Sequence, residues 1–131
     1  MNYEKTNVIS VGVDIVEVQR ISDALNTWGK KFIDRIWTSD EVDYCFSTYN
    51  PDEHFAARFA GKEAVSKSLG VTWDKGIKWK DISIVRNPSG IPEVKLSGEP
   101  RQKADELCVK NILLSMSHCS HYAVAYVLVT N

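Results

Sequence analysis

The sequence has 131 residues, of which 44% are hydrophobic and 25% charged, and this fits a single domain over residues 1–131. Its formal charge of −1 removes the general electrostatic argument for binding nucleic acid or an anionic membrane. The apolar run 122–129 is far shorter than the roughly 20 residues of a membrane-spanning helix. Because residues 1–5 also lack the apolar core of a secretory signal, we expect a cytoplasmic protein.

The three cysteines, Cys45, Cys108 and Cys119, are far apart and form no C-x-x-C motif. This spacing favours neither a disulfide framework nor a zinc site. We expect three reduced, partly buried thiols.

The N-terminal third predicts a strand followed by a helix. Residues 8–15 alternate between an apolar and a polar face, which is typical of a strand, and the polar face ends in Asp14. Apolar residues recur at helical spacing over 17–28, and Gly29 follows as a stop signal.

Two further helices are expected in the middle of the chain. Thr38 and Glu41 fit a capping box for a short helix that ends at Phe46. The segment 52–69 combines alanines with widely spaced aromatic residues, and Gly70 closes it at a position where a left-handed cap is common.

The C-terminal half alternates between strand and helix signals. The predicted elements are a hairpin of strands 82–86 and 91–96, a helix over 100–110, and strands over 112–118 and 122–129. This order predicts an α+β fold, in which an antiparallel sheet packs on the long helix of a single compact domain.

Asp14 is the first candidate for chemistry because a carboxylate interrupts an otherwise apolar strand. An ionised group there is unfavourable unless it is paired, exposed at the strand end or bound to a cation. An aspartate that caps the following helix is an equally ordinary interpretation.

The predicted helix 52–69 carries a second set of charged residues. Glu63 and Lys67 are one turn apart, as are Arg58 and Lys62, so each pair can be an ordinary solvated ion pair. If Asp14 instead faces Glu63, the two carboxylates can bind Mg²⁺ together with waters and substrate phosphates. The basic residues would then supply positive charge for a pyrophosphate.

The segment 115–118 places Ser115 and Ser117 on one strand face and ends in His118. This histidine can bind a phosphate or move a proton, but it can equally be a lone surface residue. No ligand role is expected for the tryptophans, which we assign to the core or an interface: Trp28, Trp37, Trp73 and Trp79.

Three ordered segments together resemble one family. They are VGVDIVE at 11–17, RFAGKEA at 58–64 and SMSH at 115–118, and the NPSGIP segment at 87–92 agrees with them. The set is similar to the short 4'-phosphopantetheinyl transferases, the holo-(acyl-carrier-protein) synthases. This resemblance implies an enzyme of fatty acid biosynthesis that moves phosphopantetheine from coenzyme A to a serine of an apo acyl carrier protein and releases adenosine 3',5'-bisphosphate.

The resemblance also implies residue roles. Asp14 and Glu63 are similar to the magnesium ligands, Lys67 would steady the β-phosphate or the leaving group, and Glu63 or a metal-bound water would take the serine proton. The implied catalytic residues are Asp14, Glu63, Lys67 and His118. The implied coenzyme-binding residues are Arg58, Lys62, Ser66, Gly70, Ser117 and His118.

The same family resemblance implies two kinds of protein contact. Arg20 corresponds to a basic position that receives the acidic carrier, and a homotrimer would have its coenzyme sites between subunits. Two other functions stay open: a Mg²⁺-dependent pyrophosphohydrolase of a nucleotide or coenzyme A, and a non-catalytic coenzyme-binding oligomeric protein.

Overall fold

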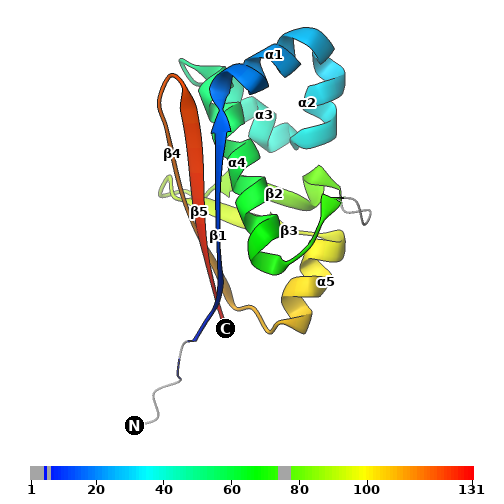
Figure 1. Cartoon of the computed structure of the whole chain (residues 1–131), viewed down its shortest axis with the longest axis vertical. Coiled ribbons are helices and arrows are strands. Elements are labelled where there is room, and N and C mark those ends of the chain that lie inside the picture. Colours follow the sequence, from blue (N-terminus) through cyan, green and yellow to red (C-terminus); the bar gives the residue numbers. More distant parts are fainter. Residues whose placement is uncertain (1–4, 6, 74–77) are drawn as a thin grey trace.

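The long helix α4 (Pro51–Leu69) is the element around which the others are arranged (Figure 1). The computed structural model describes residues 5, 7–73 and 78–131. Small residues along α4 let neighbours approach from several sides, so most of the helix is buried. The helix ends at Gly70, whose φ of 68° is the left-handed conformation expected of a C-terminal cap.

A three-stranded antiparallel sheet covers one side of α4. Its order is β1 (Val8–Glu17), β5 (Tyr122–Thr130) and β4 (Asn111–His118) (Figure 1). The inward-facing residues of β5 are fully buried against the helix, and the small ones allow a close approach: Ala123, Ala125, Val127 and Val129. Together with the helices, this sheet confirms the predicted α+β class.

The outer face of the sheet is apolar and exposed. Val13 lies opposite Tyr126 and Ile15 opposite Val124, so side chains from β1 and β5 form one continuous surface. The alternation predicted for β1 is therefore present, but its apolar face points outward, with Ile15 65% exposed. The polar face, which carries Asp14, points towards α4.

Three helices precede α4 and gather at one end of the molecule (Figure 1). They are α1 (Val18–Trp28), α2 (Lys30–Ile36) and α3 (Ser39–Phe46). Helix α2 was not predicted from the sequence, because Gly29 reads as a stop signal. Gly29 has a φ of 55° and changes the chain direction at a single residue, after which the helix resumes.

The predicted capping box and hairpin are both confirmed. The Thr38 side chain accepts from the Glu41 backbone N–H, and the Glu41 carboxylate accepts from the Thr38 N–H. The hairpin pairs β2 (Ile82–Arg86) with β3 (Pro92–Leu96) in a second, two-stranded sheet.

The last helix, α5 (Gly98–Glu106), follows the hairpin. It begins two residues earlier and ends four residues earlier than the predicted 100–110. None of the helices in the described part of the chain is long and apolar enough to cross a bilayer.

The packing of β1 on α4 predicts a sharp difference between two glycines. A Cβ atom at Gly12 would overlap the backbone carbonyl oxygen of Ala64, whereas one at Gly61 would meet the movable end of the Ile84 side chain. Gly12→Ala should therefore lower the free energy of unfolding by about 2–3 kcal/mol, and Gly61→Ala by under about 1 kcal/mol. Urea unfolding at one protein concentration measures both, and equal losses would contradict the packing described.

Candidate functional site

Packing between β1 and α4 brings the first group of candidate residues together. The two elements run in opposite directions, because the Ser10 hydroxyl donates to the Ser68 carbonyl oxygen at 2.6 Å while Gly12 lies against Ala64. Asp14, two residues further along the same face of β1, therefore lies over the middle of α4. The absence of a side chain at Gly12 allows this close approach.

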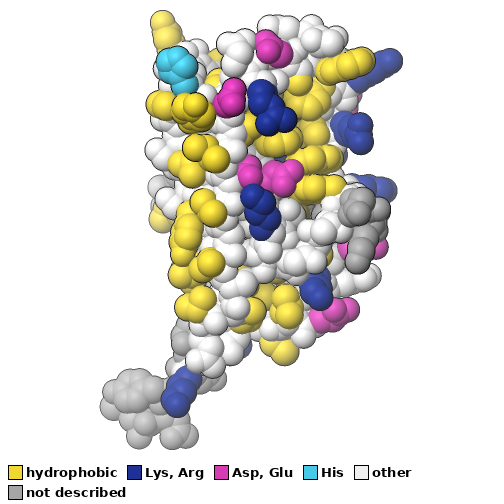
Figure 2. Space-filling view, in the orientation of Figure 1, with side chains coloured by type: hydrophobic (Ala, Val, Ile, Leu, Met, Phe, Trp, Pro, Cys, Tyr) yellow, Lys and Arg dark blue, Asp and Glu magenta, His cyan; other side chains and the backbone are white. Residues whose placement is uncertain are grey.

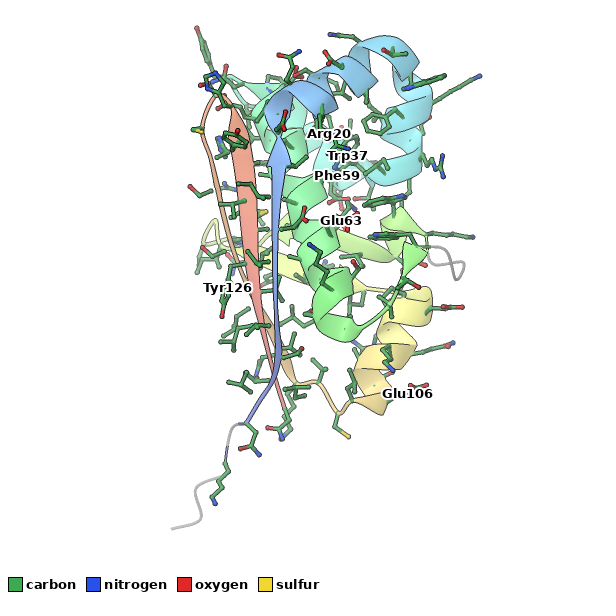
Figure 3. The ribbon with its side chains drawn as sticks, viewed as in Figure 1. Arg20, Trp37, Phe59, Glu63, Glu106 and Tyr126 are labelled. Carbon is green, nitrogen blue, oxygen red and sulfur yellow. The ribbon has the colours of Figure 1, made fainter. Side chains whose placement is uncertain are left out.

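Asp14, Glu63 and Lys67 form a charged cluster at this junction. The Lys67 ammonium lies 2.9 Å from Asp14 Oδ1 and also donates to the Val13 carbonyl oxygen at 3.1 Å. Figure 2 shows acidic side chains with a basic one directly beside them at the place where Figure 3 labels Glu63. The structure thus brings together the two predicted metal ligands and the predicted catalytic lysine.

The Glu63 carboxyl has a raised pKa, chiefly because burial penalises its charged form. The indole N–H of Trp73 counteracts this effect, the negative charge of Asp14 raises the pKa further, and Lys67 lowers it. Two carboxylates that repel each other in a partly dry setting favour a bound cation. No group of three or more His, Cys, Asp or Glu in the described residues could hold a metal ion, so a cation here would need waters or substrate oxygens as well.

Lys62 points into the interior rather than to this cluster. Its ammonium lies 2.7 Å from Glu41 Oε1 and donates to the carbonyl oxygens of Ile82 and Trp79, and both charged side chains are 0% exposed. Burial lowers the Lys62 pKa, and the Glu41 charge opposes that effect. This geometry argues against the predicted role of Lys62 in binding the coenzyme, since the ammonium is already fully engaged.

Arg58 is also buried, but it borders a pocket. Its guanidinium lies 4.0 Å from the centre of the Tyr44 ring, and the guanidinium of Arg86 lies 4.6 Å from the same ring. With Lys95 and Asp40 these residues line a surface cavity of about 350 Å³ that has three cationic side chains and one acidic side chain. Arg58 Nε is buried without a hydrogen-bond partner, so the cavity is suited to an anionic ligand.

Two predicted coenzyme ligands have local roles within α4 and at its end. The Ser66 hydroxyl is buried and donates to the Glu63 carbonyl oxygen at 2.8 Å. Gly70 is exposed and closes the helix. Neither observation requires a ligand.

His118 belongs to a second cluster, at the end of β4. Its Nδ1 lies 3.5 Å from Glu53 Oε1, and its ring packs edge-on against His54 with centroids 4.6 Å apart. Burial lowers the pKa of His54, and His118 lowers it further. Ser117 is exposed on the outer face of the sheet.

The two clusters lie on the same face of the three-stranded sheet, against α4, but on its two opposite edge strands. Asp14 is on β1 and His118 is on β4, and the whole of β5 runs between these strands (Figure 1). Within one chain the predicted catalytic residues therefore form two groups rather than one.

Several residues of these clusters were missed from the sequence. Glu41 was recognised only as a capping residue, and Tyr44, Glu53 and Arg86 stand in no motif. Trp73 was assigned to the core or an interface. Contacts between residues distant in sequence leave no signal in local spacing, and each of these residues acts through such a contact.

Comparison with models of known families matches residues 10–127 to the 4'-phosphopantetheinyl transferase superfamily. The chain belongs to this superfamily. The holo-(acyl-carrier-protein) synthase of Chlamydia muridarum is 45% identical over 126 residues, which cover 95% of this chain and 98% of that protein. The synthase of Solibacter usitatus is 39% identical over 124 residues, covering 95% and 99%.

Solved structures agree with these relatives. The Helicobacter pylori holo-(acyl-carrier-protein) synthase in complex with coenzyme A aligns with a TM-score of 0.79 at 32% identity, covering 91% of this chain and 98% of that one. The Plasmodium yoelii synthase aligns with a TM-score of 0.80 at 29% identity, covering 98% of each chain. The family resemblance inferred from the sequence is confirmed.

The interior position of Lys62 leads to a test of its role. Lys62→Met leaves the Glu41 carboxylate buried without its cation and should lower the free energy of unfolding by about 3–5 kcal/mol. Adding Glu41→Gln, which removes that charge, should restore part of the loss. Lys67→Met, at a site that is 54% exposed, should change stability by under about 1 kcal/mol.

Urea unfolding of the three variants and the wild type measures these differences. A Lys62→Met protein that is as stable as the wild type would contradict a structural role and return Lys62 to the coenzyme site.

Proposed function

We propose that this protein transfers the 4'-phosphopantetheine group of coenzyme A to a serine of an apo acyl carrier protein, with Mg²⁺, and releases adenosine 3',5'-bisphosphate. The observation that supports this proposal most directly is the cluster of Asp14, Glu63 and Lys67 where β1 meets α4, in a chain of this superfamily. The relatives named for this reaction match it along almost their whole length. A cytoplasmic location stays a prediction.

The donor chemistry of the cluster fits Mg²⁺. Asp14 and Glu63 would hold the ion, which usually takes one or two carboxylates and completes its shell with waters and substrate phosphates. When bound, Mg²⁺ neutralises charge on the pyrophosphate. The raised pKa of Glu63 supports this assignment, because a nearby cation relieves the unfavourable charge.

The residues of the chain supply position and charge for the transfer. The serine oxygen forms a bond to the phosphorus that carries pantetheine, and the bond from that phosphorus to the departing bisphosphate breaks. Lys67, whose side chain is 54% exposed, would balance negative charge on the leaving group. Glu63 is the candidate base for the serine proton, as the family resemblance implies.

We further propose a homotrimer in which each coenzyme site combines two copies of the chain. The exposed apolar face of β1 and β5 supports association, because contiguous apolar patches of this kind mark interfaces. Figure 2 shows hydrophobic side chains along this edge of the molecule. The position of Asp14 and His118 on the two different edge strands of the sheet supports a shared site, and the number three follows from the family resemblance.

The carrier would dock on α1. Arg20 is exposed in the first turn of this helix, three residues after the end of β1, which carries Asp14 (Figure 3). A basic residue there can pair with an acidic carrier whose serine must reach the Asp14 and Glu63 carboxylates.

Intact mass spectrometry of an apo acyl carrier protein tests the reaction. After incubation with this protein, coenzyme A and Mg²⁺, the carrier should gain the mass of one phosphopantetheine, and a chelator should abolish the gain. Asp14→Asn and Glu63→Gln should each reduce the rate by about 100-fold or more, as expected for loss of a charge aimed at the reacting groups. The matched control is Asp105→Asn, on the remote helix α5, which should leave the rate unchanged.

Other results would favour the alternatives. Cleavage of coenzyme A without any carrier would indicate a hydrolase. Full activity in both carboxylate variants would remove them from the mechanism. An unmodified carrier that a known transferase does modify would contradict the proposed function itself.

Mixed assemblies test whether a site is shared between copies. Glu63→Gln and His118→Ala should each be inactive alone. An equal mixture of the two, refolded together, should recover about a quarter of wild-type activity. In randomly assembled closed rings, about a quarter of the shared sites combine an intact Glu63 from one copy with an intact His118 from its neighbour. Ile15→Glu added to both chains should prevent recovery by blocking association. No recovery in mixtures whose trimeric mass is verified would contradict a shared site.

A further inference from the structure

A series of ring contacts at the start of α4 leads from His118 to the cationic cavity. The His54 ring lies between two others, with its centroid 4.6 Å from that of His118 on β4 and 5.5 Å from that of Tyr44 on α3. The guanidinium groups of Arg58 and Arg86 lie over the Tyr44 ring at 4.0 Å and 4.6 Å. Because Tyr44 and both arginines line the cavity, a single aromatic ring separates His54 from it.

The charged surroundings of His54 are mostly positive. The titratable groups that face it come from four elements: Tyr44 on α3, Glu53 and Arg58 on α4, Arg86 on β2, and His118 on β4. Glu53 is the one acid among these groups, and its carboxylate already lies 3.5 Å from His118 Nδ1. A proton on His54 would therefore add positive charge beside two guanidinium groups, while the neighbouring carboxylate faces a different ring.

The pKa of His54 is lowered in this setting. Burial has the largest effect and the charge of His118 the next largest. Arg58 and Arg86 lower the pKa as well, whereas Glu53 raises it. Imidazole ordinarily titrates just below neutral pH, so His54 is neutral at pH 7 in the free protein. An anion among the cavity's three cations would offset the charges of both arginines and make a proton on His54 less unfavourable.

We propose that His54 is a proton-linked group of the coenzyme site: it is neutral in the free protein and takes up a proton when phosphate groups of coenzyme A enter the cavity beside Tyr44. This inference rests on the proposed function, which supplies the anionic ligand. Proton uptake and ligand binding must strengthen each other by the same factor. Coenzyme binding should therefore tighten as the pH falls below the pKa of His54 in the complex, until the pH reaches its lower pKa in the free protein.

Imidazole NMR signals of the full chain, followed through a pH titration, test the proton uptake. The His54 signal is the one absent in His54→Phe, a variant that keeps an aromatic ring between Tyr44 and His118. Saturation with coenzyme A and Mg²⁺, without carrier, should raise the pKa of His54 by about one. If His54→Phe does not fold, replacing His118 and His121 singly identifies the signal by elimination. The same His54 pKa with and without bound coenzyme would overturn the proposal.

Calorimetric titration with coenzyme A measures the consequence for affinity. Between about pH 8 and about pH 6, the affinity of the wild type should rise about 3-fold relative to that of His54→Phe, since one group takes up most of a proton on binding. The comparison removes the titration of the coenzyme's own phosphates, which is the same for both proteins. An identical pH dependence in the two proteins would overturn the proposal.

Two matched arginine variants test the link between the cavity and the imidazole. Arg86→Gln removes a cation that faces His54 and should raise the His54 pKa in the free protein. The control Arg101→Gln removes the same charge from a 63% exposed site on α5, at the other end of the molecule from the turn between β4 and β5 (Figure 1). It should leave the His54 pKa unchanged. A His54 pKa that is equal in Arg86→Gln and the wild type would overturn the proposed link.

The carrier assay separates this inference from the proposed function. A wild type that binds coenzyme A and modifies the carrier, with no change in the protonation of His54 on binding, overturns the inference alone. A wild type that neither binds coenzyme A nor modifies the carrier overturns both.

Discussion

The buried ion pair of Lys62 and Glu41 is the interaction on which the arrangement of this molecule depends. It joins three elements, because Lys62 on α4 donates to the Ile82 carbonyl oxygen while Glu41 on α3 accepts from the Ile84 N–H at 3.1 Å. Removing both charges from water is unfavourable unless every polar atom finds a partner. These hydrogen bonds meet that condition, so α3 and the hairpin can take only one position on α4.

Close contact between β1 and α4 is the second constraint, and it places the carboxylates. Gly12 lets the strand approach the backbone of Ala64, and Asp14 follows two residues later on the same face. The negative charge of Asp14 raises the pKa of Glu63, and Lys67 offsets this only in part. The same contact that stabilises the fold thus creates a local need for a cation.

Local sequence patterns predicted the elements well but not which surfaces they bury. The alternation of β1 fixed which residues share a face, yet its apolar face points outward, because the side facing α4 needs small or polar residues. The i, i+4 spacing of Arg58 and Lys62 was equally consistent with a solvated pair. Both are buried, because the alanine-rich α4 is covered on several sides and has no apolar stripe to reveal this. Helix α2 was not predicted because Gly29, with its positive φ, changes the direction of the chain and a new helix begins directly after it.

The proposed homotrimer would account for both the outward apolar face and the division of the catalytic candidates into two groups. In an isolated chain the Ile15 side chain is 65% exposed, so its burial contributes little hydrophobic stabilisation to β1. Burying that face against another copy removes apolar surface from water and can bring the β4 end of one chain towards the β1 edge of the next. Arg58 and His118 would then face a ligand held by Asp14 and Glu63 of a different copy. On this view association and catalysis depend on the same sheet, so a substitution on its outer face should impair both together.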